Sequence, residues 1–325
     1  MDRLKFAIIG AGSMARRHLQ VLQSLPDVEV VAASSRGAEK LEKFAKEFGI
    51  LQTFRNNGQM LTSVKPDAVV VAVSVTNVHN VAISCIERGV PTLLEKPPGL
   101  TSEQTENLLK ASQRVRGQYM VGLNRRFYGV VQNAKKMVHD SGGLVSVLVH
   151  YTQDMAAVRA SDLHPPEVLE HWMAADAMHC VDLLRVFGGE VASVHALSSA
   201  WRGTMPNSYG ALIRFENGAI GHFVSNWTSP GRWEVTAYGF DMRVDLSPLE
   251  EGRVTRRGGS VEQLPKDDTD LKFKPGFYLQ DKYFVDHVKQ DEPIEPPAAN
   301  LEDAYHTMQL VDAIAYSHAN NVTSR

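Results

Sequence analysis

The feature that most constrains the fold of this chain is the segment Gly-Ala-Gly-Ser-Met-Ala at residues 10–15. It follows the apolar run 6–9 and precedes a helix-compatible stretch, so the local order is strand, glycine turn, helix. In such a turn Gly10 permits the sharp change of direction, and Gly12 lets the backbone come close to a pyrophosphate. The small Ala15 lets the helix pack on the strand, with its N-terminal amides facing the phosphates. A dinucleotide is therefore the expected ligand, although a tight turn can use the same residues for packing alone.

Length and composition narrow the class of protein. With 325 residues and 43% hydrophobic content, the chain can bury a sizeable core and fits two domains better than one. A net charge of -3 provides no cationic field, so neither nucleic acid nor a membrane surface is an expected partner. The two cysteines, Cys85 and Cys180, cannot form a disulfide framework and indicate a reducing compartment. No apolar run approaches the roughly 20 residues of a membrane span, and strand residues from Leu4 leave no room for a signal peptide, so we expect a cytoplasmic protein.

The N-terminal part alternates short aliphatic runs with amphipathic stretches of helical length. The expected strands are 6–9, 28–33, 68–73, 91–94 and 119–122, and the expected helices are 13–24, 37–48, 78–88 and 102–115. Parallel strands need crossover helices and are buried on both faces, so this alternation predicts a parallel sheet covered on both sides. Residues 1–122 are therefore predicted to form a Rossmann dinucleotide-binding domain.

The second part of the chain has a different pattern: longer runs in which apolar and polar residues alternate, with fewer helical stretches between them. The expected strands are 144–151, 191–200, 209–215, 219–227, 234–238 and 242–246. Asn217-Gly218 between two runs is a hairpin signal, and two helical stretches, 278–289 and 301–317, close the chain. Residues 123–325 are predicted to form an α+β domain with a large, mostly antiparallel open sheet, whose outer face could join subunits.

The residues after the second expected strand bear on the choice of dinucleotide. An NAD-preferring fold usually has an acid there to bind the ribose 2′-hydroxyl. This chain has Ser34-Ser35-Arg36, and Lys40 lies one turn into the next helix. Hydroxyls and a guanidinium can bind a 2′-phosphate, so the segment favours NADP over NAD. Alternatively, these residues only fill a polar loop and cap the helix.

Polar residues follow two other expected strands at their carboxyl ends, where open sheets of this kind bind ligands. Ser74, Asn77 and His79 come after the run 68–73, and Glu95-Lys96 comes after the run 91–94. A lysine beside a nicotinamide ring can hydrogen-bond the reacting oxygen, stabilise developing negative charge or transfer a proton. The alternative is an ordinary exposed charge pair before a proline.

Taken together, these motifs resemble the glucose-fructose oxidoreductase, inositol dehydrogenase and rhizopine-catabolism (Gfo/Idh/MocA) oxidoreductases. The resemblance rests on the glycine motif, Asn77 with His79, Glu95-Lys96-Pro97, the segment 124–127 and His179-x-x-Asp182, which occur in this order over nearly the whole chain. It implies a Rossmann domain, a second domain whose open sheet covers the active site and makes dimers or tetramers, and hydride transfer on sugars, polyols or related cyclic alcohols. It also implies that Lys96 and His179 are the acid/base pair.

The stretch 162–188 carries a polar face across an otherwise apolar helix. At about 100° per residue, Trp172, Asp176 and Asp182 lie within about 60° of His179 around the helix. His179 then exchanges a proton with the substrate while hydride moves to or from the nicotinamide; the alternative is a histidine that only packs. A metal site is not expected, because His171 and His179 are about 12 Å apart along the helix and hydride transfer with a lysine needs no metal.

The chain departs from the family pattern at two positions. Many members have an aspartate four residues before the histidine, where this chain has Ala175, and proline is common where it has Ser74. Asp176, through a local distortion of the helix, or Asp182 is then expected to orient His179. The expected catalytic residues are accordingly Lys96, His179, Asp176 and Asp182.

These observations predict an NAD(P)-dependent oxidoreductase acting on a sugar-like or cyclic polyol substrate. One alternative is a relative that retains its cofactor and cleaves a glycosidic bond or transfers hydride between two sugars. Another is a dinucleotide-binding sensor without turnover. The expected cofactor-binding residues are Gly10, Gly12, Ser13, Met14, Ser35, Arg36, Ser74, Asn77, His79, Glu95, Lys96 and Asn124. The expected substrate-binding residues are Arg126, Tyr151, Trp172 and Tyr283, since aromatic faces suit sugar rings and a guanidinium suits hydroxyls or a carboxylate.

Overall fold

The computed structural model describes residues 3–202 and 204–317. They form two compact units, one made by the chain up to Phe127 together with Thr269–Tyr305, and the other by Tyr128–Asp268 together with the chain from His306. The predicted division between residues 122 and 123 thus differs from the compact units in where 123–127 and 269–305 belong. The segment 269–305 joins the N-terminal residues because it adds a strand to their sheet and packs Phe284 against Phe6, with the two ring centroids 6.1 Å apart.

The first unit contains the predicted parallel sheet, which is confirmed. Its strands run in the order β15-β6-β5-β4-β1-β2-β3, and all neighbours pair in parallel except β15 with β6. The bounds are β1 (Leu4–Ile9), β2 (Val28–Ser34), β3 (Gln52–Phe54), β4 (Ala68–Val71), β5 (Thr92–Glu95), β6 (Tyr119–Gly122) and β15 (Ala299–Asn300). Every residue of β4, β5 and β6 is buried, as expected of central strands covered on both faces.

Amphipathic helices follow the strands of this sheet. Their bounds are α1 (Ser13–Leu22), α2 (Ala38–Phe48), α3 (Asn57–Val64), α4 (Val75–Ile86), α5 (Ser102–Ser112), the 3₁₀ turn η1 (Asn124–Phe127), α10 (Asp268–Lys272) and α11 (Phe277–Gln290). In α1 the buried side chains Ala15, His18, Leu19 and Leu22 recur at the spacing of one helix face. That face places a histidine in the interior of the unit.

The second unit contains an eight-stranded sheet in the order β14-β13-β12-β11-β7-β10-β9-β8. Its strands are β7 (Leu144–Thr152), β8 (Val191–Ser199), β9 (Ser208–Phe215), β10 (Ile220–Asn226), β11 (Glu234–Gly239), β12 (Met242–Leu246), β13 (Gly252–Arg256) and β14 (Val261–Leu264). All neighbours are antiparallel except β7 and β10, so the expected mostly antiparallel sheet is confirmed. Gly218 takes a φ of 88° in the β9–β10 hairpin that Asn217-Gly218 predicted.

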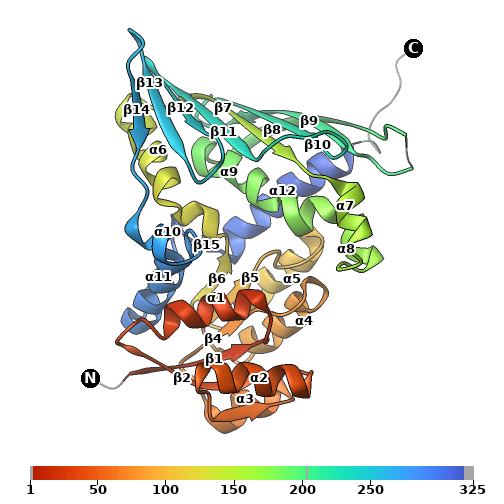
Figure 1. Cartoon of the computed structure of the whole chain (residues 1–325), viewed down its shortest axis with the longest axis vertical. Helices are drawn as coiled ribbons and strands as arrows, with labels where there is room; N and C mark the ends of the chain where they lie inside the picture. Colours follow the sequence, from red (N-terminus) through yellow and green to blue (C-terminus); the bar gives the residue numbers. More distant parts are fainter. Residues whose placement is uncertain (1–2, 203, 318–325) are drawn as a thin grey trace. The chain divides into compact units, whose positions relative to one another are not determined.

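Helices cover one face of this sheet. The helical elements are α6 (Gly129–Asp140), α7 (Met155–Ala160), α8 (Pro166–Glu170), the π turn η2 (Met173–Ala177), α9 (Met178–Gly188) and α12 (Leu301–Ala315). Both α6 and α9 lie against the sheet (Figure 1). The opposite face carries exposed apolar side chains, namely Leu197, Leu212, Ile220, Val224 and Tyr238. Within the described ranges, no helix has the length and apolar character needed to cross a membrane.

Candidate active site

The glycine turn has the geometry that its sequence predicts. Gly10 has a φ of 123°, and its amide donates a 2.8 Å hydrogen bond to the carbonyl of Ser34 at the end of β2. A Cβ atom at Gly10 would lie 2.0 Å from the carbonyl oxygen of Ala72, just beyond β4. Only glycine satisfies both the backbone angle and this close approach. The turn therefore brings the start of α1 to the carboxyl ends of β1, β2 and β4.

The N-terminus of α1 has backbone amides that no side chain caps, and it can bind an anion. Gly12 is its N-cap, and no side chain caps the helix there. A Cβ atom at Gly12 would meet nothing within 4 Å. The first-turn amides of Ser13 and Met14, together with the positive end of the helix dipole, can accordingly bind phosphate oxygens. The residues present fit the pyrophosphate of a dinucleotide.

The end of β2 is cationic and lacks an acid. Ser34 is buried and donates to Asn57, whereas Ser35 is partly exposed and Arg36 is exposed. Arg55, which follows β3, donates a 3.1 Å hydrogen bond to the carbonyl of Arg36. The sequence interpretation missed Arg55 because it missed β3. The Arg55 guanidinium is thus a second positive charge beside Arg36, the residue predicted to favour NADP over NAD.

Ser74 and Asn77 are joined where β4 gives way to α4. Ser74 is the N-cap of α4, and the Asn77 side-chain amide donates to its hydroxyl over 2.7 Å. The backbone amide of Asn77 donates to the Ser74 carbonyl over 2.8 Å. His79 lies two residues further along α4, with Nδ1 3.1 Å from Oδ1 of Asn80. Two predicted cofactor residues, Ser74 and Asn77, therefore form one ordered turn at the carboxyl edge of the sheet.

The end of β5 holds a buried ionic cluster that the sequence interpretation missed. Glu95 is the last residue of β5, Lys96 follows it, and the Lys96–Pro97 peptide bond is cis. His18 from α1 lies against Glu95, with Nε2 3.2 Å from Oε1. On its other side, Nδ1 of His18 lies 2.8 Å from Oδ2 of Asp281 on α11. Asp281 is 263 residues away in the chain, so no local pattern connects the two.

The cluster changes the proton affinity of each of its members. Burial by itself lowers the pKa of His18, but the charge of Asp281 and hydrogen bonds to Asp281 and Glu95 raise it to about 10. Burial works to raise the pKa of Glu95, yet the hydrogen bond and charge of His18 lower it, aided by Lys96 and Lys274. For Asp281 the burial effect dominates and raises the pKa, while His18 opposes it. The mutual contacts favour an ionised cluster at neutral pH.

Lys274 is a further missed residue at this edge. Its Nζ lies 3.3 Å from Sδ of Met14 in the first turn of α1 and 4.7 Å from the ring centroid of Phe277. Burial lowers the pKa of Lys274, Glu95 raises it, and nearby cations lower it further. The predicted cofactor residue Asn124 reaches the same segment, donating a 2.9 Å hydrogen bond to the carbonyl of Pro275.

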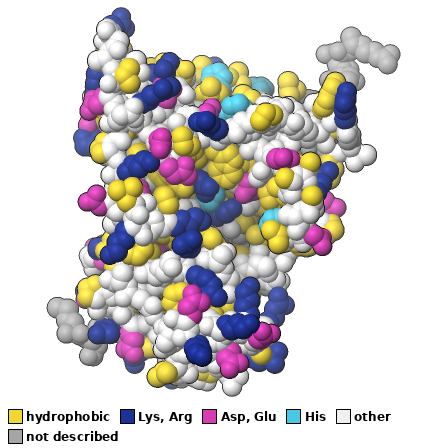
Figure 2. Space-filling model, in the orientation of Figure 1, with side chains coloured by type: hydrophobic (Ala, Val, Ile, Leu, Met, Phe, Trp, Pro, Cys, Tyr) yellow, Lys and Arg dark blue, Asp and Glu magenta, His cyan; other side chains and the backbone are white. Residues whose placement is uncertain are grey.

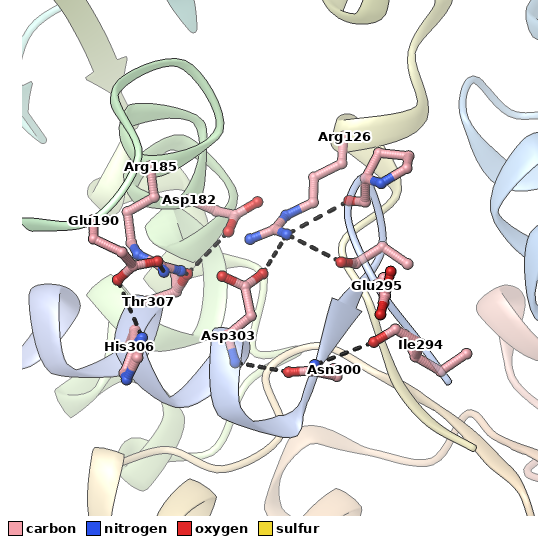
Figure 3. Close-up of polar contacts among 12 residues, drawn as sticks. Arg126, Asp182, Arg185, Glu190, Ile294, Glu295, Asn300, Asp303, His306 and Thr307 are labelled. Carbon is pink, nitrogen blue, oxygen red and sulfur yellow. Dashed lines mark hydrogen bonds and ion pairs between the residues drawn. The ribbon is translucent and has the colours of Figure 1, made fainter. Parts of the chain in front are cut away.

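Arg126 and Tyr283, both predicted to bind substrate, instead contact the segment 295–298 that precedes α12. Arg126 is buried, forms an ion pair with Asp303 and donates to the carbonyl of Ala298 over 3.4 Å (Figure 3). The hydroxyl of Tyr283 donates a 2.8 Å hydrogen bond to the carbonyl of Glu295. These contacts give both side chains a structural role, and their contact with substrate stays a prediction.

The His179 segment begins with a π turn. Met173–Ala177 form the π turn, and α9 starts at Met178, so the local distortion anticipated for this helix is present. Single π turns inside helices often accompany functional sites. His179 is buried, and Asp182 is buried one turn later. Oδ1 of Asp182 accepts a 3.0 Å hydrogen bond from the hydroxyl of Thr307, which in turn accepts one from Arg185 over 2.9 Å (Figure 3).

Asp176 belongs to a hydrogen-bonded aromatic network in the second unit. Its Oδ2 accepts from the Tyr151 hydroxyl over 2.7 Å and from the Gln153 amide over 3.2 Å. The indole of Trp172 donates to the Tyr151 hydroxyl over 3.1 Å, and the ring of Trp233 lies 5.1 Å from that of Tyr151. Tyr151 and Trp172 are both buried, so neither ring presents an open face. Their binding to substrate stays a prediction, and the structure gives them a packing role.

The predicted residues thus fall into two groups by unit. The first unit brings together the α1 turn, Ser74 with Asn77, Glu95 with Lys96, and Asn124. The second unit brings together Asp176, His179 and Asp182 on η2 and α9. Among the residues described, no group of three or more His, Cys, Asp or Glu side chains is arranged to hold a metal ion.

Comparison with known protein families agrees with this geometry. Residues 4–123 match the model of the oxidoreductase family with an NAD-binding Rossmann fold, and residues 131–244 match the GFO/IDH/MocA C-terminal domain. The chain belongs to the GFO/IDH/MocA oxidoreductase family. The resemblance noted in the sequence is therefore confirmed, and with it an NAD-binding oxidoreductase fold.

Characterised members of the GFO/IDH/MocA family are distant in sequence but similar along most of the chain. The scyllo-inositol 2-dehydrogenase (NAD(+)) of Bacillus subtilis (strain 168) is 24% identical over 308 residues, covering 88% of this chain and 86% of the relative. The myo-inositol 2-dehydrogenase of Thermotoga maritima is 23% identical over 334 residues, covering 94% of each chain.

Solved structures share the whole fold. A levoglucosan dehydrogenase in complex with NADH and levoglucosan superposes with a TM-score of 0.84 at 20% identity, covering 98% of both chains. An oxidoreductase from Agrobacterium radiobacter, solved in complex with NAD+, L-tartaric acid and magnesium, gives a TM-score of 0.81 at 16% identity, covering 98% of this chain and 97% of the other. At these identities the likeness concerns the fold alone.

Proposed function

We propose that the protein transfers a hydride between a nicotinamide dinucleotide and a carbinol or carbonyl carbon of a sugar-like or cyclic polyol substrate. The observation that carries the proposal is the uncapped N-terminus of α1, open at Gly12, on the same sheet edge as Glu95 and Lys96. A helix N-terminus that can bind phosphates and a lysine at the carboxyl edge of the same parallel sheet suit the binding of a nicotinamide dinucleotide with a polar group near its ring. The names of the inositol and levoglucosan dehydrogenases support the substrate class.

The chemistry divides between the dinucleotide and the chain. When bound, the nicotinamide accepts or gives up the hydride. Lys96 donates a hydrogen bond to the reacting oxygen and stabilises the negative charge that develops there. His179 takes the hydroxyl proton during oxidation and returns it during reduction. Asp176 precedes His179 and is anchored by a hydrogen bond from Tyr151. Asp182 follows His179 and is anchored by a hydrogen bond from Thr307. These two contacts order the backbone on either side of His179.

The same proposal includes a preference for NADP, with NAD also accepted. Ser35, Arg36 and Arg55 lie together at the end of β2, where a 2′-phosphate would need hydrogen-bond donors and positive charge. Along Val28–Ser34 and the two residues that follow, the only acid is Glu29, at the opposite end of the strand. Ser74, Asn77, His79 and Asn124 are proposed to line the rest of the dinucleotide site.

We also propose that the protein is a cytoplasmic homo-oligomer, a dimer or a tetramer, joined through the outer face of the second unit's sheet. Leu197, Leu212 and Val224 are exposed on that face, and apolar side chains gathered on one surface are typical of protein–protein contacts. A second copy covering it would remove these side chains from water. Neither Cys85 nor Cys180, both of which lie in the described part of the chain, takes part in a disulfide, which favours a reducing compartment.

A substrate panel with a stoichiometric readout tests the proposed function. Purified protein freed of dinucleotide is mixed with NADP+ or NAD+ and with myo-inositol, scyllo-inositol, levoglucosan or related polyols. We expect net formation of reduced dinucleotide, equal in amount to the ketone produced. Dinucleotide that stays bound through turnover without net reduction would favour the cofactor-retaining alternative, and binding without turnover on the whole panel would favour the sensor.

A further inference from the structure

The interior of the first unit holds a histidine that the proposed chemistry does not use. His18 is completely buried on the inner face of α1. Its Nδ1 lies 2.8 and 3.0 Å from the two carboxylate oxygens of Asp281, and its Nε2 lies 3.2 Å from Oε1 of Glu95. The ring also packs against Phe277, with centroids 4.9 Å apart. One imidazole thereby joins the dinucleotide-binding helix, the end of β5 and helix α11.

The position of this imidazole between two carboxyl groups favours its doubly protonated form. A carboxylate only accepts hydrogen bonds, and a neutral imidazole has one N–H donor, so it can satisfy only one of its two neighbours. An imidazolium has two donors and satisfies both. The raised pKa of His18 agrees with this reading. The cluster is then an ionised Glu95–His18–Asp281 chain with a net charge of -1.

Other charged and polar groups face the cluster from the surrounding elements. Lys96, adjoining Glu95, and Lys274, from the segment before α11, both act on Glu95 electrostatically. On the other side, Gln280 of α11 donates a 3.1 Å hydrogen bond to Oδ1 of Asp281. The net negative charge of the buried chain is thus opposed by two ammonium groups, and one of these is the proposed catalytic lysine.

We infer that His18 is a positioning residue, which, as an imidazolium clamped by Asp281, keeps Glu95 ionised and fixed and thereby sets the position and the proton affinity of Lys96. The inference rests on the proposed role of Lys96. Glu95 and Lys96 share a peptide bond, so a side chain that immobilises Glu95 also limits the backbone of Lys96. An anionic Glu95 beside Lys96 favours its ammonium form, which is the form that can donate to the reacting oxygen.

Removing the imidazolium would change both properties. In His18→Gln, two buried carboxylates lose their shared cation, and Glu95 takes up a proton at a higher pH than before. Asp281→Asn removes the clamp but keeps the shape of the side chain. Asp291→Asn is the matched control, because Asp291 also lies at α11 but forms an exposed ion pair with Arg116.

For the wild type and each variant, kcat is measured as a function of pH on a substrate that the wild type oxidises. The dissociation constant of NADPH is measured on the same proteins by fluorescence. For His18→Gln and Asp281→Asn we expect kcat to fall by about tenfold or more, because Glu95 is no longer fixed. For His18→Gln, which removes the cation beside Glu95, we also expect the acid limb of the kcat–pH profile to move up by about one pH unit. NADPH affinity should stay within about threefold, because the α1 amides are intact. Asp291→Asn should match the wild type in all three.

Two results would overturn the inference. One is a wild-type kcat in both cluster variants together with a wild-type pH profile in His18→Gln, with only the melting temperatures lowered, which would make the cluster only a structural link between three elements. The other comes from wild-type protein labelled with ¹⁵N-histidine, with the His18 signal assigned through its contact with the Phe277 ring, whose centroid lies 4.9 Å from that of the imidazole. A His18 ring that is neutral at pH 8 excludes the two-donor arrangement even if the variants do not fold.

A parallel Lys96→Met variant separates this inference from the proposed function. If Lys96→Met keeps its turnover, the proposed function fails. If Lys96→Met loses turnover while the cluster variants keep the wild-type profile, only the role of His18 fails.

Discussion

The Tyr151 hydroxyl donates a 2.7 Å hydrogen bond to Oδ2 of Asp176, the acid three residues before His179. The sequence placed this acid beside the imidazole, but its Oδ2 is occupied by Tyr151 and Gln153. Trp172 donates to the same hydroxyl, so a chain of hydrogen bonds links β7 to the π turn. We infer that Asp176 orders the backbone that leads into His179.

Removing the Tyr151 hydroxyl should therefore destabilise the second unit. In Tyr151→Phe, Asp176 loses its shorter hydrogen bond and the Trp172 indole loses its acceptor, so the free energy of unfolding should fall by about 1–3 kcal/mol. Urea unfolding measures the change. Tyr209→Phe is the matched control, because its hydroxyl donates only to the carbonyl of Pro206 and should cost about 1 kcal/mol. Equal losses for the two variants would show that the network adds nothing.

The two glycines of the turn should respond differently to alanine. In Gly10→Ala, the new Cβ would lie 2.0 Å from the Ala72 carbonyl oxygen at a φ of 123°, so the fold itself should lose about 3 kcal/mol or more. In Gly12→Ala, the Cβ meets no protein atom, so the melting temperature should stay nearly unchanged. The affinity for dinucleotide should nevertheless fall, because the Cβ occupies the approach of the phosphates. Calorimetric melting and NADPH titration give both numbers, and wild-type affinity in Gly12→Ala would remove the pyrophosphate from this helix end.

The proposed NADP preference depends on the cations at the end of β2. Replacing Arg36 by alanine should raise the KM for NADPH by roughly tenfold, the loss of one charge-assisted contact, and leave the KM for NADH nearly unchanged. Arg55→Ala should have a smaller effect in the same direction. Lys43→Ala is the control, since Lys43 pairs with Glu39 on the exposed face of α2. A wild-type enzyme that prefers NADH contradicts the assignment.

The buried imidazolium makes stability depend on pH. Burial disfavours it, but Asp281 and Glu95 raise the pKa of His18 from 6.5 to about 10, so the folded state holds a proton that the unfolded chain releases at lower pH. This contribution is fully present below pH 6.5 and is lost as pH rises toward 10. Between these values the free energy of unfolding should fall by up to about 1.4 kcal/mol per pH unit. Urea unfolding at about pH 7, 8 and 9 tests the slope, which should be absent in His18→Gln.

The sequence predicts the parts of the fold that local patterns encode. The glycine turn, the buried strands β4 to β6 and the Asn217-Gly218 hairpin each have a short-range signal, and all are present. Two of the strands that were missed, β3 and β14, carry little signal. Strand β3 has three residues, two of them polar and exposed, and β14 exposes three of its four residues. A short strand with exposed side chains shows no apolar periodicity.

Long-range contacts explain what could not be predicted at the site. His18 reads as one more residue on α1, and Asp281 as a polar position on a distant helix; only the tertiary fold makes them partners. Likewise, Arg55 reaches the carbonyl of Arg36 only because β3 pairs with β2. The motifs that were found, Glu95-Lys96 and the glycine turn, are those whose chemistry depends on a few consecutive residues.

In the proposed reaction Lys96 stabilises the charge on the reacting oxygen and His179 exchanges its proton while hydride moves. The most direct test is the kcat for NADP+-dependent oxidation by Lys96→Met and by His179→Asn, with NADPH affinity measured on the same samples. Each substitution should lower kcat by about 10²–10⁴-fold while NADPH still binds. Folded Lys96→Met or His179→Asn protein that turns over at the wild-type rate would contradict the proposed reaction.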